Sequence, residues 1–350
     1  MMHAKTTPVR LIQIGFGGWG RNWLSTVLPQ HDAVELVACV DQSTAALDTL
    51  RKEHSVPASM CFGSLNEAMT SVEADAVLIT TALEGHVPLA MEALQHGLHV
   101  LTEKPFAPSL EEADRAVAAA ERAGRVLMVS QNYRYYPAPR KAAEIVRSGR
   151  LGKLGTVHID FRRNKIQAKD KADKHYKLPD PLLADMAIHH FDLMRFVTDA
   201  EPQAMYCRAF NPPWSLYESP PAASATLSFE NDLTVTYRGS WVSPGPQTPW
   251  AGDWRMEFSG GELRWTSRGG PTAAEDRVWM RELGQEETLV PLDTMPYVDR
   301  GGALQSFVKA IRGDIDTESS GAHNRGSISM VFAAIDSSLK NQPVSVDTPV

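Results

Sequence analysis

A glycine-rich hexapeptide near the start of the chain constrains the fold more than any other sequence feature. Gly15-Phe16-Gly17-Gly18-Trp19-Gly20 follows a β-branched apolar run over Val9–Ile14 and precedes a helical pattern over Arg21–Leu28. Glycines spaced in this way, between a strand and a helix, permit a tight turn, close approach of the backbone to a phosphate, and close helix–strand packing. We therefore expect residues 15–20 to bind the pyrophosphate of a dinucleotide at a helix N-terminus.

The strand-turn-helix unit repeats through the first third of the chain. Short β-branched runs alternate with amphipathic stretches, which is typical of a parallel sheet flanked by helices. We predict strands at Val9–Ile14, Val34–Val40, Ala76–Thr80, His99–Thr102 and Val126–Ser130. Helices are expected between them, at Arg21–Leu28, Thr44–Glu53, Leu65–Ser71, His86–Gln95 and Leu110–Ala123.

An acidic residue ends the second predicted strand. Asp41 lies 21 residues beyond Gly20, where a carboxylate can accept hydrogen bonds from ribose hydroxyls and repel a 2′-phosphate. This position favours NAD over NADP as the cofactor. Asp41 can also be explained as a turn residue before a helix that Ser43 caps.

The pattern changes near residue 132, which divides the chain into predicted domains of residues 1–131 and 132–350. Short strands separated by turns follow, and we expect them to form a large, mostly antiparallel open sheet. One face of this sheet should be apolar and covered by helices at about 181–197, 305–312 and 327–340. The other face should be free, which favours a homodimer or homotetramer formed through the sheet.

Composition excludes several classes of function. The 350 residues carry 35 Lys and Arg against 42 Asp and Glu, so the net charge is −7, opposite in sign to a nucleic-acid binder. Three widely spaced cysteines without a Cys-x-x-Cys pair favour a reducing cytoplasm. No apolar run reaches the roughly 20 residues of a membrane helix, and we expect neither a membrane anchor nor a signal peptide.

The triplet Glu103-Lys104-Pro105 follows the predicted strand His99–Thr102. Ligands of open parallel sheets bind at the carboxyl ends of the strands, and the proline keeps Lys104 out of the helical region of backbone angles. An ammonium group here can stabilise an alkoxide-like oxygen. We therefore select Lys104 as a candidate catalytic residue, with a solvated surface lysine as the alternative.

Asp185, His189 and Asp192 are spaced as i, i+4 and i+7 in a predicted helix, which places them on one face. A histidine can exchange a proton with an alcohol near neutral pH, and Asp185 can orient its ring. The alternative is a helix cap beside a buried structural histidine. A metal site that adds His175 or His190 is disfavoured, because hydride transfer needs a positioned base and no cysteine completes a zinc set.

These motifs together resemble the Gfo/Idh/MocA oxidoreductases, a family that includes inositol dehydrogenases and sugar dehydrogenases. The resemblance covers most of the chain. The matching features are the glycine loop with Asp41, Thr81 with His86, Glu103-Lys104-Pro105, Asn132-Tyr133-Arg134, and the set Asp185, His189 and Asp192. One departure is Thr80-Thr81-Ala82-Leu83, where the family commonly has Ala-Thr-Pro-Asn.

The resemblance implies a Rossmann domain followed by an α/β domain on a large open sheet. It implies catalytic roles for Lys104 and His189, and a carboxylate at Asp185 that contacts the substrate or the histidine. The expected cofactor ligands are Gly15, Phe16, Gly17, Gly18, Trp19, Gly20, Asp41, Thr81, His86, Glu103 and Lys104. Trp19 is also explained by packing beside Trp23.

The resulting hypothesis is an NAD-dependent dehydrogenase that oxidises a secondary alcohol of a sugar, inositol or related polyol. Lys104 and His189 should then converge on one cleft beside the nicotinamide. Two alternatives are a cofactor-recycling oxidoreductase with tightly bound NAD and a dinucleotide-binding regulator without catalysis.

Two further features leave alternatives open. The basic run from Arg162 to Lys177 is either solvated surface or a lid that favours an acidic or phosphorylated substrate. The second feature is a group of tryptophans, which packing at the sheet edge or stacking on a sugar explains equally well. Its members are Trp214, Trp241, Trp250 and Trp254.

Overall fold

The computed structural model describes residues 7–165, 174–270, 272–315 and 317–348. The middle of the basic run, residues 166–173, lies outside this described part. The chain divides into two compact units. The first unit contains Met1–Asn132 and Arg300–Arg325, and the second contains Tyr133–Asp299 and Gly326–Val350.

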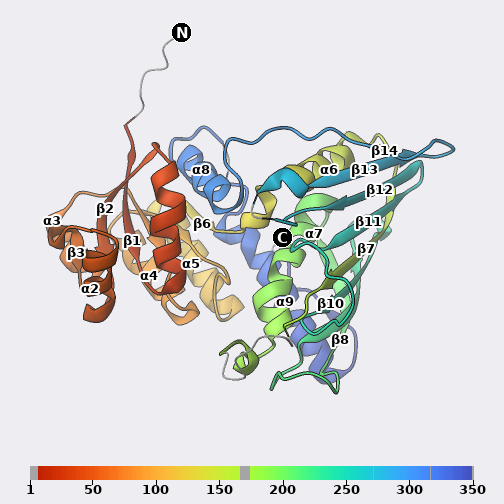
Figure 1. Cartoon of the computed structure of the whole chain (residues 1–350), viewed down its shortest axis with the longest axis horizontal. Helices are drawn as coiled ribbons and strands as arrows, with labels where there is room; N and C mark the ends of the chain where they lie inside the picture. The colour runs from red at the N-terminus through yellow and green to blue at the C-terminus, as the bar shows by residue number, and fades with distance from the viewer. Residues whose placement is uncertain (1–6, 166–173, 271, 316, 349–350) are drawn as a thin grey trace, which may run out of the picture. The chain divides into compact units, whose positions relative to one another are not determined.

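The first unit contains a six-stranded parallel sheet in the order β3-β2-β1-β4-β5-β6 (Figure 1). Strand β4 is buried along its whole length and β5 at all but its first residue, as expected when helices cover both faces of a sheet. The strands are β1 (Val9–Ile14), β2 (Val34–Val40), β3 (Cys61–Phe62), β4 (Ala76–Ile79), β5 (His99–Thr102) and β6 (Leu127–Val129). The parallel α/β prediction is confirmed, and the two-residue strand β3 was not predicted.

Helix ends in the first unit follow local capping chemistry. The Ser43, Ser64 and Ser109 hydroxyls accept hydrogen bonds from backbone N–H groups in the first turns of α2, α3 and α5. Gly124 ends α5 in the left-handed conformation that favours glycine. The helices are α1 (Gly18–Asn22), α2 (Thr44–Glu53), α3 (Leu65–Ser71), α4 (Leu83–Gln95), α5 (Leu110–Ala123) and α8 (Asp299–Ile311).

Residues 300–325 return to the first unit, although the sequence suggested that all of 132–350 forms the second domain. Ser319 exchanges hydrogen bonds with Val129, and Ser320 pairs with Met128 across an antiparallel bridge. This segment therefore extends the first sheet beyond its edge strand β6. The predicted helix at 305–312 exists within α8, but it belongs to the first unit rather than to the helices that cover the second sheet.

The second unit contains a nine-stranded sheet in the order β14-β13-β12-β11-β7-β10-β9-β8-β15. Only β7 and β10 pair in parallel, so the mostly antiparallel prediction is confirmed. The strands are β7 (Leu154–Arg162), β8 (Pro202–Phe210), β9 (Ala222–Phe229), β10 (Thr234–Ser240), β11 (Asp253–Phe258), β12 (Gly261–Thr266), β13 (Arg277–Glu282), β14 (Thr288–Leu289) and β15 (Val344–Ser345).

Alternation along these strands separates a buried face from an open one. Leu227 and Val235 are fully buried, whereas Thr226 on β9 and Arg238 on β10 are exposed. Three helices lie beside this sheet (Figure 1), namely α6 (Pro137–Ser148), α7 (Ile188–Thr198) and α9 (Gly321–Lys340). The prediction of one apolar and one polar face is confirmed for the β9–β10 hairpin.

Over the described ranges, the longest apolar stretches in helices are too short or too polar to cross a bilayer.

Candidate functional site

The glycine loop, residues 15–20, turns sharply between β1 and α1. Gly15 has φ +93°, a left-handed conformation that favours glycine. A Cβ atom on Gly20 would lie 2.0 Å from the carbonyl oxygen of Gly15, so only glycine fits there without a shift of the backbone. These two glycines therefore fix the shape of the turn.

The middle of the glycine loop faces open space. A Cβ atom added to Gly17 or Gly18 would meet nothing within 4 Å. Gly17 lines a cavity of about 630 Å³ together with Asp41, Thr81 and residues of the β2–α3 region. The N-cap Gly17 places no side chain over the first turn of α1, so its N–H groups can bind an anion. This is the geometry that a bound pyrophosphate requires.

Asp41 binds the loop as well as lining this cavity. Its Oδ2 accepts a 2.7 Å hydrogen bond from the backbone N–H of Phe16, and its Oδ1 accepts a 2.8 Å bond from the N–H of Ser43. Ser43 in turn caps α2. Both uses suggested for Asp41 are therefore compatible: the side chain organises the turn and lies at the cavity.

Two buried polar residues that no sequence motif indicated donate hydrogen bonds to carbonyl groups of the glycine loop. The Thr80 hydroxyl donates to the carbonyl oxygen of Gly15 at 2.6 Å, and the Gln13 amide donates to that of Gly20 at 2.8 Å. Both side chains are buried. A glutamine in an otherwise apolar strand was the available sequence signal, because a buried amide needs partners.

Trp19 is 51% exposed and packs against Arg300. The Arg300 guanidinium carbon lies 4.3 Å from the Trp19 ring centroid and 5.3 Å from that of Trp23. Arg300 also donates a 2.6 Å hydrogen bond to the Asn22 side chain. All four residues belong to the first unit. No local pattern indicated Arg300, because it lies 278 residues beyond its partner Asn22 in the chain.

The triplet Glu103-Lys104-Pro105, called here the lysine turn, follows β5. Glu103 is buried, and its carboxylate accepts hydrogen bonds from the Trp23 indole N–H at 2.7 Å and from the Lys104 backbone N–H at 3.2 Å. His86 of α4 places Nδ1 2.7 Å from the Pro105 carbonyl oxygen and Nε2 3.2 Å from that of Thr81. Burial lowers the pKa of His86 below its usual value.

In the second unit, the predicted continuous α-helix at 181–197 has two parts. Residues Pro181–Ala187 form a π-helical segment, and α7 begins at Ile188. The predicted spacing of Asp185, His189 and Asp192 assumes one α-helical period, whereas in the structure it crosses from a π-helical segment into α7. Asp185 lies in the π-helical segment, where its Oδ2 is 3.5 Å from His175 Nε2.

His189 is 6% exposed and stacks on Tyr133, with ring centroids 4.1 Å apart and planes 7° from parallel. The Arg268 guanidinium carbon lies 4.0 Å from the same Tyr133 ring. Two planar groups cannot share one face of a ring at these distances, so Arg268 and His189 occupy opposite faces. Burial raises the pKa of Tyr133, which keeps its hydroxyl protonated. Tyr133 therefore fixes the plane of the candidate histidine.

The remaining acidic and histidine side chains of this helix are structural. Asp192 is buried and accepts hydrogen bonds from Arg134 at 2.5 and 2.7 Å and from the Ser327 hydroxyl at 3.0 Å. His190 contacts the Tyr237 hydroxyl and the Trp250 carbonyl oxygen, each at 3.0 Å. Burial lowers the pKa of His190 to about 4. Across the described ranges, no three His, Cys, Asp or Glu side chains gather as a metal site.

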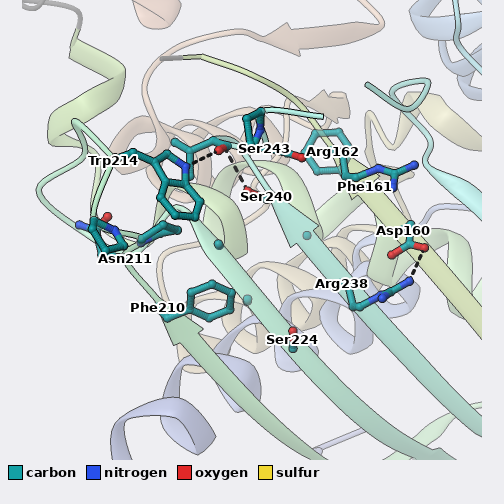
Figure 2. A pocket seen from close by; sticks show the side chains of 17 residues that line it. Asp160, Phe161, Arg162, Phe210, Asn211, Trp214, Ser224, Arg238, Ser240 and Ser243 are labelled. Carbon is teal, nitrogen blue, oxygen red and sulfur yellow. Dashed lines mark hydrogen bonds and ion pairs between the residues drawn. The ribbon is translucent and has the colours of Figure 1, made fainter. Parts of the chain in front are cut away.

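A second cavity of about 540 Å³ lies over β7, β8, β9 and β10 of the second unit. Figure 2 shows Trp214 and Phe210 beside it, with the Asp160–Arg238 ion pair at 2.7 Å on the other side. Trp214 is 53% exposed and donates a hydrogen bond to the Val242 carbonyl oxygen. Trp241 and Trp254 are buried in the sheet packing, so the four tryptophans do not form one wall.

Two segments of the chain match known protein families. Residues 9–131 match "Oxidoreductase family, NAD-binding Rossmann fold", and residues 139–264 match "GFO/IDH/MocA C-terminal domain". The two matches together span most of the chain and fall in both units.

Several individual proteins are similar to this chain. The protein y4oX of Sinorhizobium fredii is 27% identical over 96% of this chain and 95% of its own length. An inositol 2-dehydrogenase of an Arthrobacter species is 26% identical, over 58% of each chain. A solved inositol dehydrogenase homolog of Azotobacter vinelandii, complexed with NADH and myo-inositol, has a TM-score of 0.82 and 19% identity, covering 97% of this chain and 98% of its own.

Proposed function

The chain belongs to the Gfo/Idh/MocA family of oxidoreductases, and on that premise we propose that it is an NAD-dependent dehydrogenase of a secondary alcohol in a sugar, inositol or related polyol. The observation that carries this proposal is the glycine loop. Gly17 and Gly18 leave room that a Cβ would occupy. Gly17 and Asp41 both line the cavity beside this loop. Relatives that act on inositol support a polyol as the substrate.

The residues of the first unit fit a dinucleotide. Backbone N–H groups at the start of α1 would bind the pyrophosphate, and Asp41 would accept hydrogen bonds from the ribose hydroxyls. A 2′-phosphate beside the same carboxylate would be repelled, which favours NAD over NADP. Bound NAD would supply the hydride acceptor.

Four side chains would act on the substrate or orient the groups that do. In this proposal Lys104 stabilises negative charge on the alcohol oxygen, and His189 takes the hydroxyl proton as hydride leaves the carbon. Tyr133, stacked on His189, holds the imidazole in one plane. Asp185 would orient the histidine or contact the substrate. The contact between Asp185 and His175 restricts the orientation of the Asp185 carboxylate.

An absorbance screen at the NADH band tests this proposal, with NAD and NADP against sugars, inositols and sugar acids. Lys104→Ala or His189→Ala should each lower the rate by about 10²–10⁴. Surface residues offer matched controls, Lys153→Ala and His96→Ala, because both side chains are exposed. Wild-type turnover in both active-site variants would refute the assigned roles.

The double variant tests whether the two groups act on one substrate. If Lys104 and His189 act on the same oxygen, their losses should not add, because groups that act as a unit give strongly non-additive effects. Fully additive losses would indicate independent roles.

The alternatives give different results in the same assay. A cofactor-recycling enzyme would convert substrate without stoichiometric release of NADH. A regulator without catalysis would bind NAD, yield no turnover across the panel, and retain a protein partner in a pull-down.

We also propose that the open face of the nine-stranded sheet binds a second copy of the chain. The exposed Phe210 and Trp214 line one cavity on this sheet, and Arg side chains pair with Asp or Glu along neighbouring strands. Phe210 is 41% exposed there (Figure 2). Phe210→Glu should therefore lower the mass measured by sedimentation. Leu339→Glu, at an exposed position of α9, is the control.

A further inference from the structure

We propose that His86 and Glu103 are positioning residues that hold the lysine turn from two sides and connect it to the glycine loop. The chemical role of Lys104 rests on the proposed function, but the connection itself does not. All the contacts that carry the inference lie within the first unit. They differ from the expectation that His86 and Glu103 bind the cofactor directly.

Glu103 holds one side of the turn. Both of its carboxylate oxygens are occupied: Oε1 accepts the indole N–H of Trp23 at 2.7 Å, and Oε2 accepts the backbone N–H of Lys104 at 3.2 Å. Glu103 is 5% exposed and Trp23 is fully buried. Trp23 directly follows α1, the short helix that begins in the glycine loop. The carboxylate therefore joins the lysine turn to that helical segment.

His86 holds the other side. A buried imidazole whose pKa lies below its usual value is neutral at pH 7 and has one N–H. We assign this N–H to Nδ1, because its 2.7 Å contact with the Pro105 carbonyl oxygen is shorter than the 3.2 Å contact of Nε2 with that of Thr81. The ring then lies between the carbonyl oxygens of Pro105 and Thr81 and restrains the residue that directly follows Lys104.

Thr81 closes the connection to the glycine loop. A Cβ on Gly15 would lie 2.6–2.9 Å from atoms of Thr81, so the two residues are in direct contact. Thr80 adds a 2.6 Å hydrogen bond to the Gly15 carbonyl oxygen. The path from the glycine loop through Thr81, His86, the lysine turn and Trp23 returns to the helix that follows the loop. A shift of the Lys104 backbone would therefore strain a contact in this closed path.

Side-chain geometry gives a specific set of variants at position 86. Asparagine places an amide N–H close to the position of imidazole Nδ1, so His86→Asn retains a donor for the Pro105 carbonyl. Glutamine reaches the position of Nε2 instead, beside Thr81. His86→Leu fills similar space without a donor. If the Pro105 bond positions Lys104, then His86→Asn should behave like the wild type, whereas His86→Gln and His86→Leu should not.

The reactivity of Lys104 can be measured without a known substrate. We would treat the full-length protein with acetic anhydride and quantify acetylation of Lys104 by peptide mass spectrometry. Loss of one hydrogen bond should change the Lys104 rate by about threefold to tenfold in His86→Gln and His86→Leu. Lys153, an exposed lysine of the second unit, provides the internal control within each sample.

His96→Leu is the matched control variant, because His96 ends the same helix α4 and contacts Asn66, away from the lysine turn. Thermal unfolding of each variant shows that the chain is folded. A merely structural histidine would lower thermal stability without a selective change at Lys104. Equal Lys104 rates in the wild type, His86→Asn and His86→Leu would overturn the proposal.

NAD binding, measured by calorimetry on the same variants, separates the two roles of His86. If His86 is a positioning residue, we expect the His86 variants to bind NAD with dissociation constants within about threefold of the wild-type value. A direct cofactor ligand predicts weaker NAD binding in His86→Leu with unchanged Lys104 reactivity, which would also overturn the proposal. If the wild type binds no NAD, the proposed dehydrogenase function fails, while the acetylation rates still decide the positioning role.

Discussion

The carboxylate of Asp41 accepts the backbone N–H of Phe16 at 2.7 Å, so the residue after β2 holds the first turn of the glycine loop that follows β1. The pairing of β1 with β2 makes this contact possible, because Ile14 and Val40 lie opposite each other in the register. One acidic side chain therefore contributes to the shape of the loop and lines the cavity beside it.

Replacing Asp41 should weaken NAD binding and reduce discrimination against NADP. Asp41→Ala removes hydrogen bonds to a charged group, which are worth about 1.5–3 kcal/mol each, so the NAD dissociation constant should rise by about tenfold or more. Calorimetric titration with NAD and NADP measures both effects. Asp48→Ala is the control, because the half-exposed Asp48 side chain pairs with Arg51 on α2 and does not line the cavity. An unchanged ratio of the two dissociation constants would show that Asp41 does not select the cofactor.

Two glycines of the loop should respond differently to alanine. Gly20→Ala places a Cβ 2.0 Å from the Gly15 carbonyl oxygen, and such overpacking costs about 1–3 kcal/mol of folding free energy. Gly18→Ala meets no protein atom within 4 Å, so the free energy of unfolding should change little. Urea unfolding of both variants measures the difference. Equal stabilities would contradict the close contact between Gly15 and Gly20.

The buried ion pair of Arg134 and Asp192 should be important for stability. Their side chains are 2% and 1% exposed, and removing one partner of a buried pair costs about 3–5 kcal/mol. Asp192→Asn should therefore lower the free energy of unfolding strongly. The exposed Arg147–Asp199 pair gives the comparison, since Asp199→Asn should cost less than about 1 kcal/mol. Similar losses in both variants would count against this explanation.

Burial of His190 should make stability depend on pH. Its pKa is lowered to about 4 in the folded chain, against an ordinary value of 6.5. Between these two pKa values, His190 binds a proton in the unfolded chain but not in the folded chain. The stability that the neutral His190 contributes is therefore present above pH 6.5 and is lost as the pH falls toward 4. Between pH 7 and pH 5 the wild type should lose about 2 kcal/mol more than His190→Gln. Parallel pH dependences would show that His190 does not titrate in this range.

Local patterns were sufficient for most elements of the first unit. The glycine spacing, the β-branched runs and the serine caps act over a few residues, so they are visible in the sequence. The strand β3 was missed because two residues carry no periodicity. The π-helical segment at 181–187 was missed because the apolar pattern of a helix does not distinguish the two hydrogen-bond spacings.

The sequence by itself determined the parallel α/β unit, the glycine loop with Asp41, and the alternating faces of the second sheet, because backbone sterics and hydrophobic periodicity decide these locally. Only the tertiary structure decided which side chains hold the loop and the lysine turn: Thr80, Gln13, His86, Trp23 and Arg300. These contacts join residues from different strands and from opposite ends of the chain. A hydrogen bond depends on the positions of both partners in space, and no local pattern in either segment specifies that position.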